Sequence, residues 1–367
     1  MIEQGKIGVH QFTILTILFT IGSSILIAPS GLAFAAKQDA WIAAVLGLLV
    51  GLLLIMLYQA LGSRFPQKTL VAYSEELMGK WLGKAVSFLY FCFFFILAAL
   101  VLRNLGDFIT TQVLVDTPLQ FTHIFFLGVI ILGIRNGIET FTRTSEIFLP
   151  WVLVFFFLMF ILLPSQMKMS YLQPIFGYGL KPIVRASVSI IGTPYLELVV
   201  FLMIIPLVNQ TKKLGKAFLV GVSIGGGLLV VISLLSILVL GDDLTAVQMY
   251  PSYSLAKRIS IGSFLERLEV FMAGIWFITI YFKLTLCFYA ATMIFGEVFN
   301  LRDVRQLYLP LGMILVVLSV IAYPNTAYFI QFATKIWVFY SGTFGFLIPS
   351  LLLVLAILRK KRKPLGK

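Results

Sequence analysis

The sequence predicts an all-α integral membrane protein with about ten transmembrane helices. Of its 367 residues, 60% are hydrophobic and 12% are charged, and the mean hydropathy is +1.02, whereas a soluble domain has about a quarter charged residues. A helix that spans a bilayer needs about 20 apolar residues, and ten segments meet or approach that length. They cover residues 10–36, 41–61, 86–115, 119–134, 147–163, 183–208, 217–240, 270–295, 307–323 and 336–358.

The connections between these segments predict the orientation of the chain in the membrane. Most of the 28 Lys and Arg residues fall on the same side as both termini, and basic loops mark the cytoplasmic side. We therefore expect one transmembrane domain over residues 1–367 with both termini in the cytoplasm and a basic tail at 359–367. The net charge of +13 is then a topology signal and does not indicate nucleic acid as a partner, although the tail can also bind membrane lipid.

Two connections are predicted to carry structure of their own. Residues 69–84 are typical of a short amphipathic helix on the cytoplasmic face. Residues 241–264 form the longest outer connection, and a loop of that length is more often a lid than an idle connector. Ser263 and Glu266 have the spacing of a capping box that would start the eighth helix.

The first apolar segment is interrupted at its middle by Gly22-Ser23-Ser24, and Pro29 follows. Glycine lowers helix stability by about 1 kcal/mol relative to alanine, and hydroxyl side chains can hydrogen-bond the backbone groups that an opened helix frees. In lipid, such an opening is tolerated only where it faces protein or a watery cavity. We expect a broken helix that forms half of a ligand site.

The sixth segment contains a matching interruption at Gly192-Thr193-Pro194. Proline has no N–H to donate and clashes with the preceding turn, so this helix should open there too. Each interruption begins a set of five segments, about 8–165 and 181–358, and an odd number per set makes the second set upside down relative to the first. Paired breaks in inverted repeats indicate a central substrate site in transporters, whereas purely structural kinks are the alternative.

One charged residue lies near the middle of the eighth segment, where a charge costs about 3 kcal/mol or more. This residue is Lys283, and Glu197 just after the second break is its most plausible partner. The two could form a structural ion pair. Alternatively, the ammonium stands where a coupling cation would sit, or it contacts the ligand. The candidate ligand-binding residues are Gly22, Ser23, Ser24, Gly192, Thr193, Tyr195, Glu197 and Lys283.

The remaining polar residues indicate binding and not catalysis. Exposed N–H groups at a half-helix favour a carboxylate and freed carbonyls favour an ammonium, which describes a zwitterionic amino acid, while sugars or polyols could use the same groups. Arg103 and Asp107 share a helix face and could form an outer gate or a membrane-edge ion pair. We expect no enzyme activity, no cofactor and no metal, because no catalytic set or His/Cys ligand spacing is present.

Four further side chains are interpreted as having no functional role. The two cysteines, Cys92 and Cys287, lie inside apolar segments and are interpreted as buried, reduced thiols. The two histidines, His10 and His123, lie near segment ends and are interpreted as neutral surface residues.

Several stretches in this order resemble the B subunits of spore germinant receptors, the spore permease family of the amino acid–polyamine–organocation superfamily. The matching stretches are 21–26 with Pro29, 40–42, 195–197 with Pro206, 251–255, 264–269, 323–324 and the basic tail. One departure concerns the first break, because many members of that family carry Gly-Ala-Gly where this chain has Gly22-Ser23-Ser24, and the added hydroxyls can change which ligand fits.

The resemblance implies a LeuT-like fold with a 5+5 inverted repeat in the inner membrane of the bacterial spore. It further implies a subunit that binds a small-molecule nutrient germinant and works with an A-type membrane subunit and a C-type lipoprotein. The alternatives are a secondary active amino acid transporter and a scaffold with a vestigial pocket. The arguments from the residues alone favour the receptor and the transporter equally.

Overall fold

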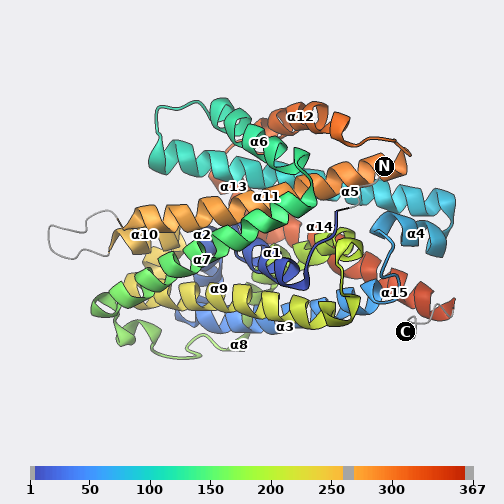
Figure 1. Ribbon diagram of the computed structural model, residues 1–367. Helices are drawn as coiled ribbons and strands as arrows, with labels where there is room; N and C mark the ends of the chain where they lie inside the picture. The colour runs from blue at the N-terminus through green and yellow to red at the C-terminus, as the bar shows by residue number, and fades with distance from the viewer. Residues whose placement is uncertain (1–4, 259–267, 360–367) are drawn as a thin grey trace.

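The computed structural model describes residues 5–258 and 268–359, which are almost entirely helical. β pairing in this part of the chain is limited to an isolated bridge between Ile7 and Val208. In Figure 1, α4 (Leu70–Met78) and the end of α15 (Ile348–Leu358) lie at one end of the helix bundle, and α10 (Pro251–Lys257) lies at the other. We call these the α4 end and the α10 end.

Seven helical stretches are long and apolar enough to cross a membrane, and three shorter apolar helices accompany them. Grouped by the predicted segments, they make ten spans within the described residues. Spans one to five are α1 (Val9–Ile21) with α2 (Ser24–Ala36), α3 (Ala40–Gly62), α5 (Lys80–Phe108) with the π-helical turn Ile109–Val113, α6 (Leu119–Arg135) and α7 (Ile138–Leu162).

The second five spans follow after a connection that carries the 3₁₀ turns Pro164–Gln166 and Met169–Leu172. They are α8 (Leu180–Ile190) with the π-helical turn Ile191–Tyr195 and the 3₁₀ segments η6 (Leu196–Met203) and η7 (Ile205–Leu207), α9 (Thr211–Val247), α11 (Glu269–Val298), α12 (Tyr308–Ile321), and α13 (Thr326–Phe332) with α14 (Val338–Gly342) and α15. Two π-helical turns, Ala333–Trp337 and Thr343–Leu347, join the parts of the tenth span.

Two spans are longer than predicted. The seventh begins at Thr211 and not at residue 217; the non-helical backbone of Gly241 (φ 78°, ψ 170°) ends its continuous part at the predicted boundary, and a separate short helical segment follows up to Val247. The tenth begins at Thr326 and not near residue 336, because the Asn325 side chain accepts a hydrogen bond from the Tyr328 N–H at 2.9 Å and starts a helix there. The polar residues in its first turns lower the hydropathy, so apolar length alone does not predict this part of the helix.

The amphipathic helix predicted at 69–84 is wrong in its extent. The helix α4 is capped by Thr69 and ends before Gly79, whose φ of 88° breaks it, and Lys80 already begins α5. A Cβ built on Gly83 would clash with the Glu75 backbone, so α4 lies directly against the start of α5. Gly79 therefore ends the predicted helix early, and Gly83 lets the two resulting helices pack closely at the corner between them.

The predicted outer connection also folds locally, as α10. Its Ser252 hydroxyl donates to the Ile25 carbonyl at 2.6 Å. That carbonyl lacks its normal partner in α2, because Pro29, four residues further along, has no N–H to donate. The capping box predicted at Ser263 lies outside the described residues, as does the tail from residue 360.

Aromatic packing places α1 in the middle of the bundle. The Phe12 ring contacts the rings of Phe201 and Phe218, each with centroids 5.3 Å apart, and Phe19 contacts Phe201 at 5.5 Å. The first span is thereby fixed against η6 of the sixth span and α9 of the seventh. This packing brings the two predicted helix breaks next to each other.

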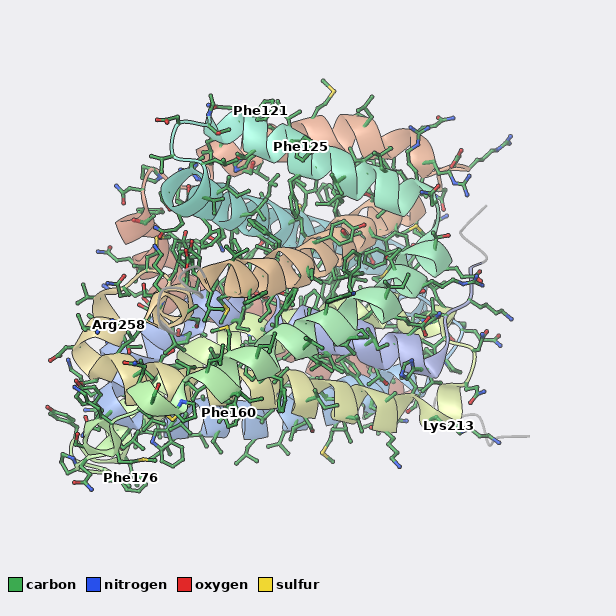
Figure 2. The ribbon with its side chains drawn as sticks, turned by 60° about the vertical axis from the view of Figure 1, so that its left-hand side comes forward. Phe121, Phe125, Phe160, Phe176, Lys213 and Arg258 are labelled. Atoms are coloured by element: carbon green, nitrogen blue, oxygen red, sulfur yellow. The ribbon has the colours of Figure 1, made fainter. Side chains whose placement is uncertain are left out.

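The outside of the bundle is apolar, as expected for a surface in lipid. Phe121 and Phe125 project from α6 along one edge and are 62% and 67% exposed (Figure 2). Phe160 of α7 is 46% exposed. Charged side chains such as Lys213 and Arg258 lie instead at the two ends of the bundle (Figure 2).

Candidate ligand site at the two helix breaks

The first break is a single distorted residue. The helix α1 ends at Ile21, Gly22 adopts φ 31° and ψ −128°, and α2 begins at Ser24. A Cβ built on Gly22 would lie 2.5 Å from Cδ of Lys283 and 2.6 Å from the Phe19 carbonyl oxygen. Both the backbone conformation and the close approach of Lys283 require glycine at this position.

The second break has a different cause. The helix α8 ends at Ile190, and Thr193 has an extended backbone (φ −143°, ψ 111°) directly before Pro194. Gly192 is buried, and a Cβ on it would lie 3.0 Å from Cγ2 of Val338 in α14. The absence of a side chain at Gly192 thus leaves room for α14, while Thr193 and Pro194 interrupt the helix.

A buried ion pair joins the two breaks. The Lys283 ammonium on α11 lies 2.6 Å from Oε2 of Glu197 on η6, and the two side chains are 0% and 1% exposed. The contact is a close ion pair without a well-directed hydrogen bond to that oxygen. The ammonium also donates to Ser23 Oγ at 3.1 Å and lies 5.3 Å from the centroid of the Phe19 ring.

The other carboxylate oxygen of Glu197 accepts two hydrogen bonds. The Trp337 indole N–H donates at 2.9 Å, and the Thr193 hydroxyl donates at 3.3 Å. On the side of the first break, the Thr279 hydroxyl of α11 donates to the Gly22 carbonyl at 3.1 Å. The network therefore connects spans one, six, eight and ten.

The energetics of this pair are asymmetric. Moving each ion out of water costs several kcal/mol, which mutual attraction and added hydrogen bonds offset. Removing one partner leaves an uncompensated buried charge, at a cost of about 3–5 kcal/mol. A ligand with its own charges or hydroxyls could replace either partner at the same position, and that would change what holds the breaks together.

The candidate residues divide into those that meet and those that do not. Gly22, Ser23, Thr193, Glu197 and Lys283 meet in the network. The Ser24 hydroxyl is buried and finds no hydrogen-bond partner among the described residues.

Tyr195 lies on the other side of the sixth span, with its ring against Gly51 of α3 and its hydroxyl against Gly226 of α9. Tyr195 and Glu197 point in different directions because residues two apart on a helix do not share a face.

Three residues of the network were not identified from the sequence. Thr279 lies one turn before Lys283 on α11, so its position could have been inferred from helical spacing. Trp337 lies in the π-helical turn before α14, and only the packing of the tenth span against the sixth reveals its contact with Glu197. Phe19 lies one turn before the first break and offers the face of its ring to the ammonium.

A second polar cluster joins α5 to the end of α12. Arg103 and Asp107 form an ion pair at 2.8 Å, and Tyr323 donates to Asp107 at 2.7 Å and to Asn104 at 3.0 Å. The Arg103 guanidinium also donates to the Val320 carbonyl near the end of α12. The predicted shared face is confirmed, and the pair is inside the protein because both residues are less than a tenth exposed.

The histidine interpretation is wrong for one of the two residues. His123 is fully buried, with Nδ1 2.8 Å from the Ser319 hydroxyl. It packs against Gly106, where any Cβ would clash with the imidazole, and this small residue lets α6 approach α5. Cys92 and Cys287 are both unpaired thiols, and only Cys287 is fully buried.

Ten helical spans among the described residues, with breaks in the first and the sixth, together with the solved structures that this fold resembles, define the class: a LeuT-like membrane protein. One similar solved structure is Mhp1, a nucleobase-cation-symport-1 family transporter, in a closed conformation with bromovinylhydantoin bound. It has a TM-score of 0.72 at 11% identity, over 98% of this chain and 80% of that chain. MhsT in complex with L-phenylalanine has a TM-score of 0.63 at 15% identity, over 95% and 88% of the two chains.

The chain belongs to the family described as spore germination protein, whose model matches residues 6–327. Spore germination protein KB of Bacillus subtilis (strain 168) is 30% identical over 369 residues, covering 100% of this chain and 98% of that protein. The putative spore germination protein YfkT of the same organism is 26% identical over 329 residues, covering 89% and 90% of the two chains. The resemblance seen in the sequence is therefore confirmed, and so are the multi-pass membrane topology and the LeuT-like fold.

Proposed function

We propose that this protein is the nutrient-sensing subunit of a spore germinant receptor, which binds a small germinant at the two breaks and signals to partner subunits. The observation that carries the proposal is the buried pair Lys283–Glu197, which joins both breaks in a chain of the spore germination family. Binding and signalling need no catalytic group, so we propose no enzyme activity.

The ligand is proposed to be an amino acid or a sugar-like solute. A carboxylate suits Ser23, Lys283 and the N–H groups at the start of α2, and an ammonium suits Glu197. The hydroxyls of Ser23, Ser24 and Thr193 suit a sugar or polyol equally well. The Ser24 hydroxyl supports a ligand here, because a buried polar group without a partner is costly unless something else binds it.

Lys283 has one of two roles in this proposal. As a fixed cation, its ammonium stands where a coupling cation would sit, among the oxygen atoms of Ser23 and Glu197. As a ligand contact, the Lys283 ammonium separates from Glu197 and pairs with the carboxylate of the ligand instead. A purely structural pair is the alternative, and it predicts a response to ligand that survives neutralisation of both residues.

The proposed setting is the inner membrane of the spore, with both termini in the cytoplasm. An A-type membrane subunit and a C-type lipoprotein are the proposed partners, as the resemblance to germinant receptor B subunits implies, and relatives such as spore germination protein B2 of Bacillus subtilis (strain 168) support a role in germination. The basic residues at the α4 end support this orientation.

A secondary active transporter is the second candidate function. The observation that favours it is the similarity to transporters such as Mhp1 over nearly the whole chain. A receptor can use the binding site of a transporter without moving the solute, so the fold is compatible with both functions.

The test combines binding with uptake. Purified protein is screened against L-amino acids, glucose and inositol by thermal shift, with Gly22→Val as the control that closes the first break. A shift in the natural protein that is absent in the variant supports the binding site. Accumulation of the same labelled solute against a gradient in vesicles contradicts the receptor in favour of the transporter. The lack of any shift contradicts the binding of these two ligand classes.

A further inference from the structure

The first two turns of α5 carry basic and aromatic side chains on one face at the α4 end. Trp81, Lys84 and Phe88 follow one another at spacings of three and four residues, so they are neighbours on the helix surface. Trp81 is 90% exposed, the highest value among the large apolar residues that the structure describes, and Phe88 is 40% exposed. Lys80, one turn before Lys84, is exposed as well. Aromatic and basic side chains gather in this way where a helix leaves the membrane core.

The facing wall is the connection that follows α11. Asn300 adopts a left-handed backbone (φ 53°) shortly after that helix ends, and the Leu301 N–H donates to the Gly296 carbonyl at 2.8 Å, a bond that closes the helix end. A Cβ built on Gly296 would clash with the Val304 side chain. The connection is therefore folded back tightly on α11, and Phe299 at its start is left 53% exposed.

Two contacts join these walls. The Lys84 ammonium donates to the Val298 carbonyl at 2.7 Å, at the end of α11 where the helix dipole favours a cation. The Phe88 ring meets the Phe299 ring edge to face, with centroids 6.4 Å apart. The bond to Val298 uses one of the three N–H groups of the ammonium. Lys84 is thus fixed in position and can still donate to an anion.

The charge of this region is unbalanced. We call residues 80–89 and 298–305 the α5–α11 corner. Its bases are Lys80, Lys84, Arg302 and Arg305, and its acid is Asp303. Asp303 is exposed and accepts from the Arg305 backbone N–H at 2.9 Å. The corner therefore has an excess of three positive charges beside exposed aromatic rings.

Acids of the neighbouring elements do not cancel this excess. Glu76 of α4 forms an ion pair with Lys68 at 2.6 Å. Glu297 near the end of α11 accepts a hydrogen bond from the Thr69 hydroxyl, and Glu75 of α4 has its backbone against α5. Counting both Glu75 and Glu297 in full still leaves the corner positive.

We propose that the α5–α11 corner binds an anionic phospholipid. The phosphate lies against Lys80 and Lys84, the Trp81 indole lies at the level of the headgroup, and an acyl chain runs along the ring of Phe88. Basic residues near the membrane surface attract anionic lipid, and tryptophan prefers that depth. The site is separate from the helix breaks, and it does not depend on the proposed function.

The exposed rings favour a lipid over a free phosphate ion. An ion would use the bases alone and would leave the rings of Trp81 and Phe299 uncovered. A lipid covers the bases with its phosphate and the rings with its glycerol and acyl chains, which removes apolar surface from water. Phosphatidylcholine offers the same chains with a headgroup of no net charge. A preference for the anionic lipid is therefore the property that the bases of the corner should add.

The Trp81 indole can report on its own lipid neighbours. Full-length protein is placed in phosphatidylcholine nanodiscs that contain a small, equal share of either brominated phosphatidylglycerol or brominated phosphatidylcholine. Bromine quenches tryptophan fluorescence at close range, and the contribution of Trp81 is the difference between the natural protein and Trp81→Phe. We expect brominated phosphatidylglycerol to quench Trp81 at least twofold more than brominated phosphatidylcholine at the same share.

Matched variants separate a site from general attraction by net charge. Lys80→Gln/Lys84→Gln should abolish the difference between the two brominated lipids, and Lys80→Arg/Lys84→Arg should keep it. Lys213→Gln/Lys216→Gln removes the same charge from exposed positions near the start of α9 and should also keep the difference.

Four outcomes overturn the proposal. Equal quenching of Trp81 by the two brominated lipids in the natural protein excludes a preference for the anionic headgroup, whether or not any variant accumulates. Equal losses in the α5 and α9 double variants show attraction by net charge alone. Loss of the preference on adding inorganic phosphate at constant ionic strength shows a site for a free anion. Quenching by neither lipid shows that Trp81 is covered by protein.

Discussion

The two broken spans open their helices by different means. In the first span, Gly22 takes a backbone conformation that side chains rarely adopt and makes room for Lys283. In the sixth, Thr193 and Pro194 interrupt the hydrogen bonding, and Gly192 only gives space to α14. The comparison teaches that one break is shaped around a neighbouring charge, whereas the other is shaped by its own sequence and then supplies the opposite charge.

The largest effect should come from leaving one charge of the pair alone. In Lys283→Met, Glu197 stays buried without its cation, and we expect a loss of about 3–5 kcal/mol in the free energy of unfolding. The double variant Lys283→Met/Glu197→Gln should recover most of that loss, because no net charge remains buried. Thermal and denaturant unfolding in detergent measure both. Equal stability of the single and double variants would show that the two charges do not interact.

A substitution at the first break should be next in size. Gly22→Ala forces a side chain into a strained backbone conformation and places its methyl group against Lys283, and we expect a loss of about 1–3 kcal/mol. Gly192→Ala, which meets only Val338, is the matched control and should cost less than half as much. The same unfolding experiments decide, and a larger loss for Gly192→Ala would reverse the comparison between the breaks.

The hydrogen bond from the tenth span should have an intermediate effect. In Trp337→Phe the Glu197 carboxylate loses its shortest neutral donor, and bonds to charged groups contribute about 1.5–3 kcal/mol. Trp151→Phe is the control, because Trp151 is 55% exposed on α7 and its replacement should change stability by less than about 0.5 kcal/mol. Losses of the same size in both variants would remove Trp337 from the network.

The smallest effect is expected at Tyr195. Its buried hydroxyl has no hydrogen-bond partner among the described side chains and backbone groups and, unlike that of Ser24, lies away from the breaks, against Gly226 of α9, so Tyr195→Phe should leave stability and ligand response unchanged. Tyr58→Phe is the matched control, because the Tyr58 hydroxyl donates to the Gly345 carbonyl at 2.6 Å and its loss should cost about 1 kcal/mol. A lost ligand response in Tyr195→Phe alone would return Tyr195 to the ligand site.

Much of the fold could be predicted because membrane spans leave a strong local signal. The length of the apolar segments predicts the ten spans. Gly22 and Pro194, which lie in the first segment of each set of five, predict the two breaks. The pairing of Lys283 with Glu197 could be suggested because few charged residues lie far from the ends of the apolar segments, and each needs a partner. These inferences depend on residue type and position alone.

The remaining features of the fold and the site depend on which helix faces pack against each other. Residue type alone does not determine that packing. Trp337 reaches Glu197 only because the tenth span packs against η6, and the face of the sixth span that carries Tyr195 is set by the break itself. His123 looked like a surface residue because it is near a segment end, yet Gly106 lets its helix approach closely enough to bury it. The early start of the tenth span was missed because a side-chain cap, and not hydropathy, begins it.

The hydrogen bond between Ser252 and Ile25 has a genetic consequence. Pro29 in α2 creates the free carbonyl, and Ser252 in α10 uses it, so these two positions carry one shared trait although they are distant in the sequence. Pro29→Ala supplies an N–H for the Ile25 carbonyl, so that carbonyl no longer needs Ser252. Ser252→Ala leaves the same carbonyl without a donor as long as residue 29 is proline. Substitutions at the two sites should therefore be strongly non-additive, and a change at one should be tolerated best in chains that have already changed at the other.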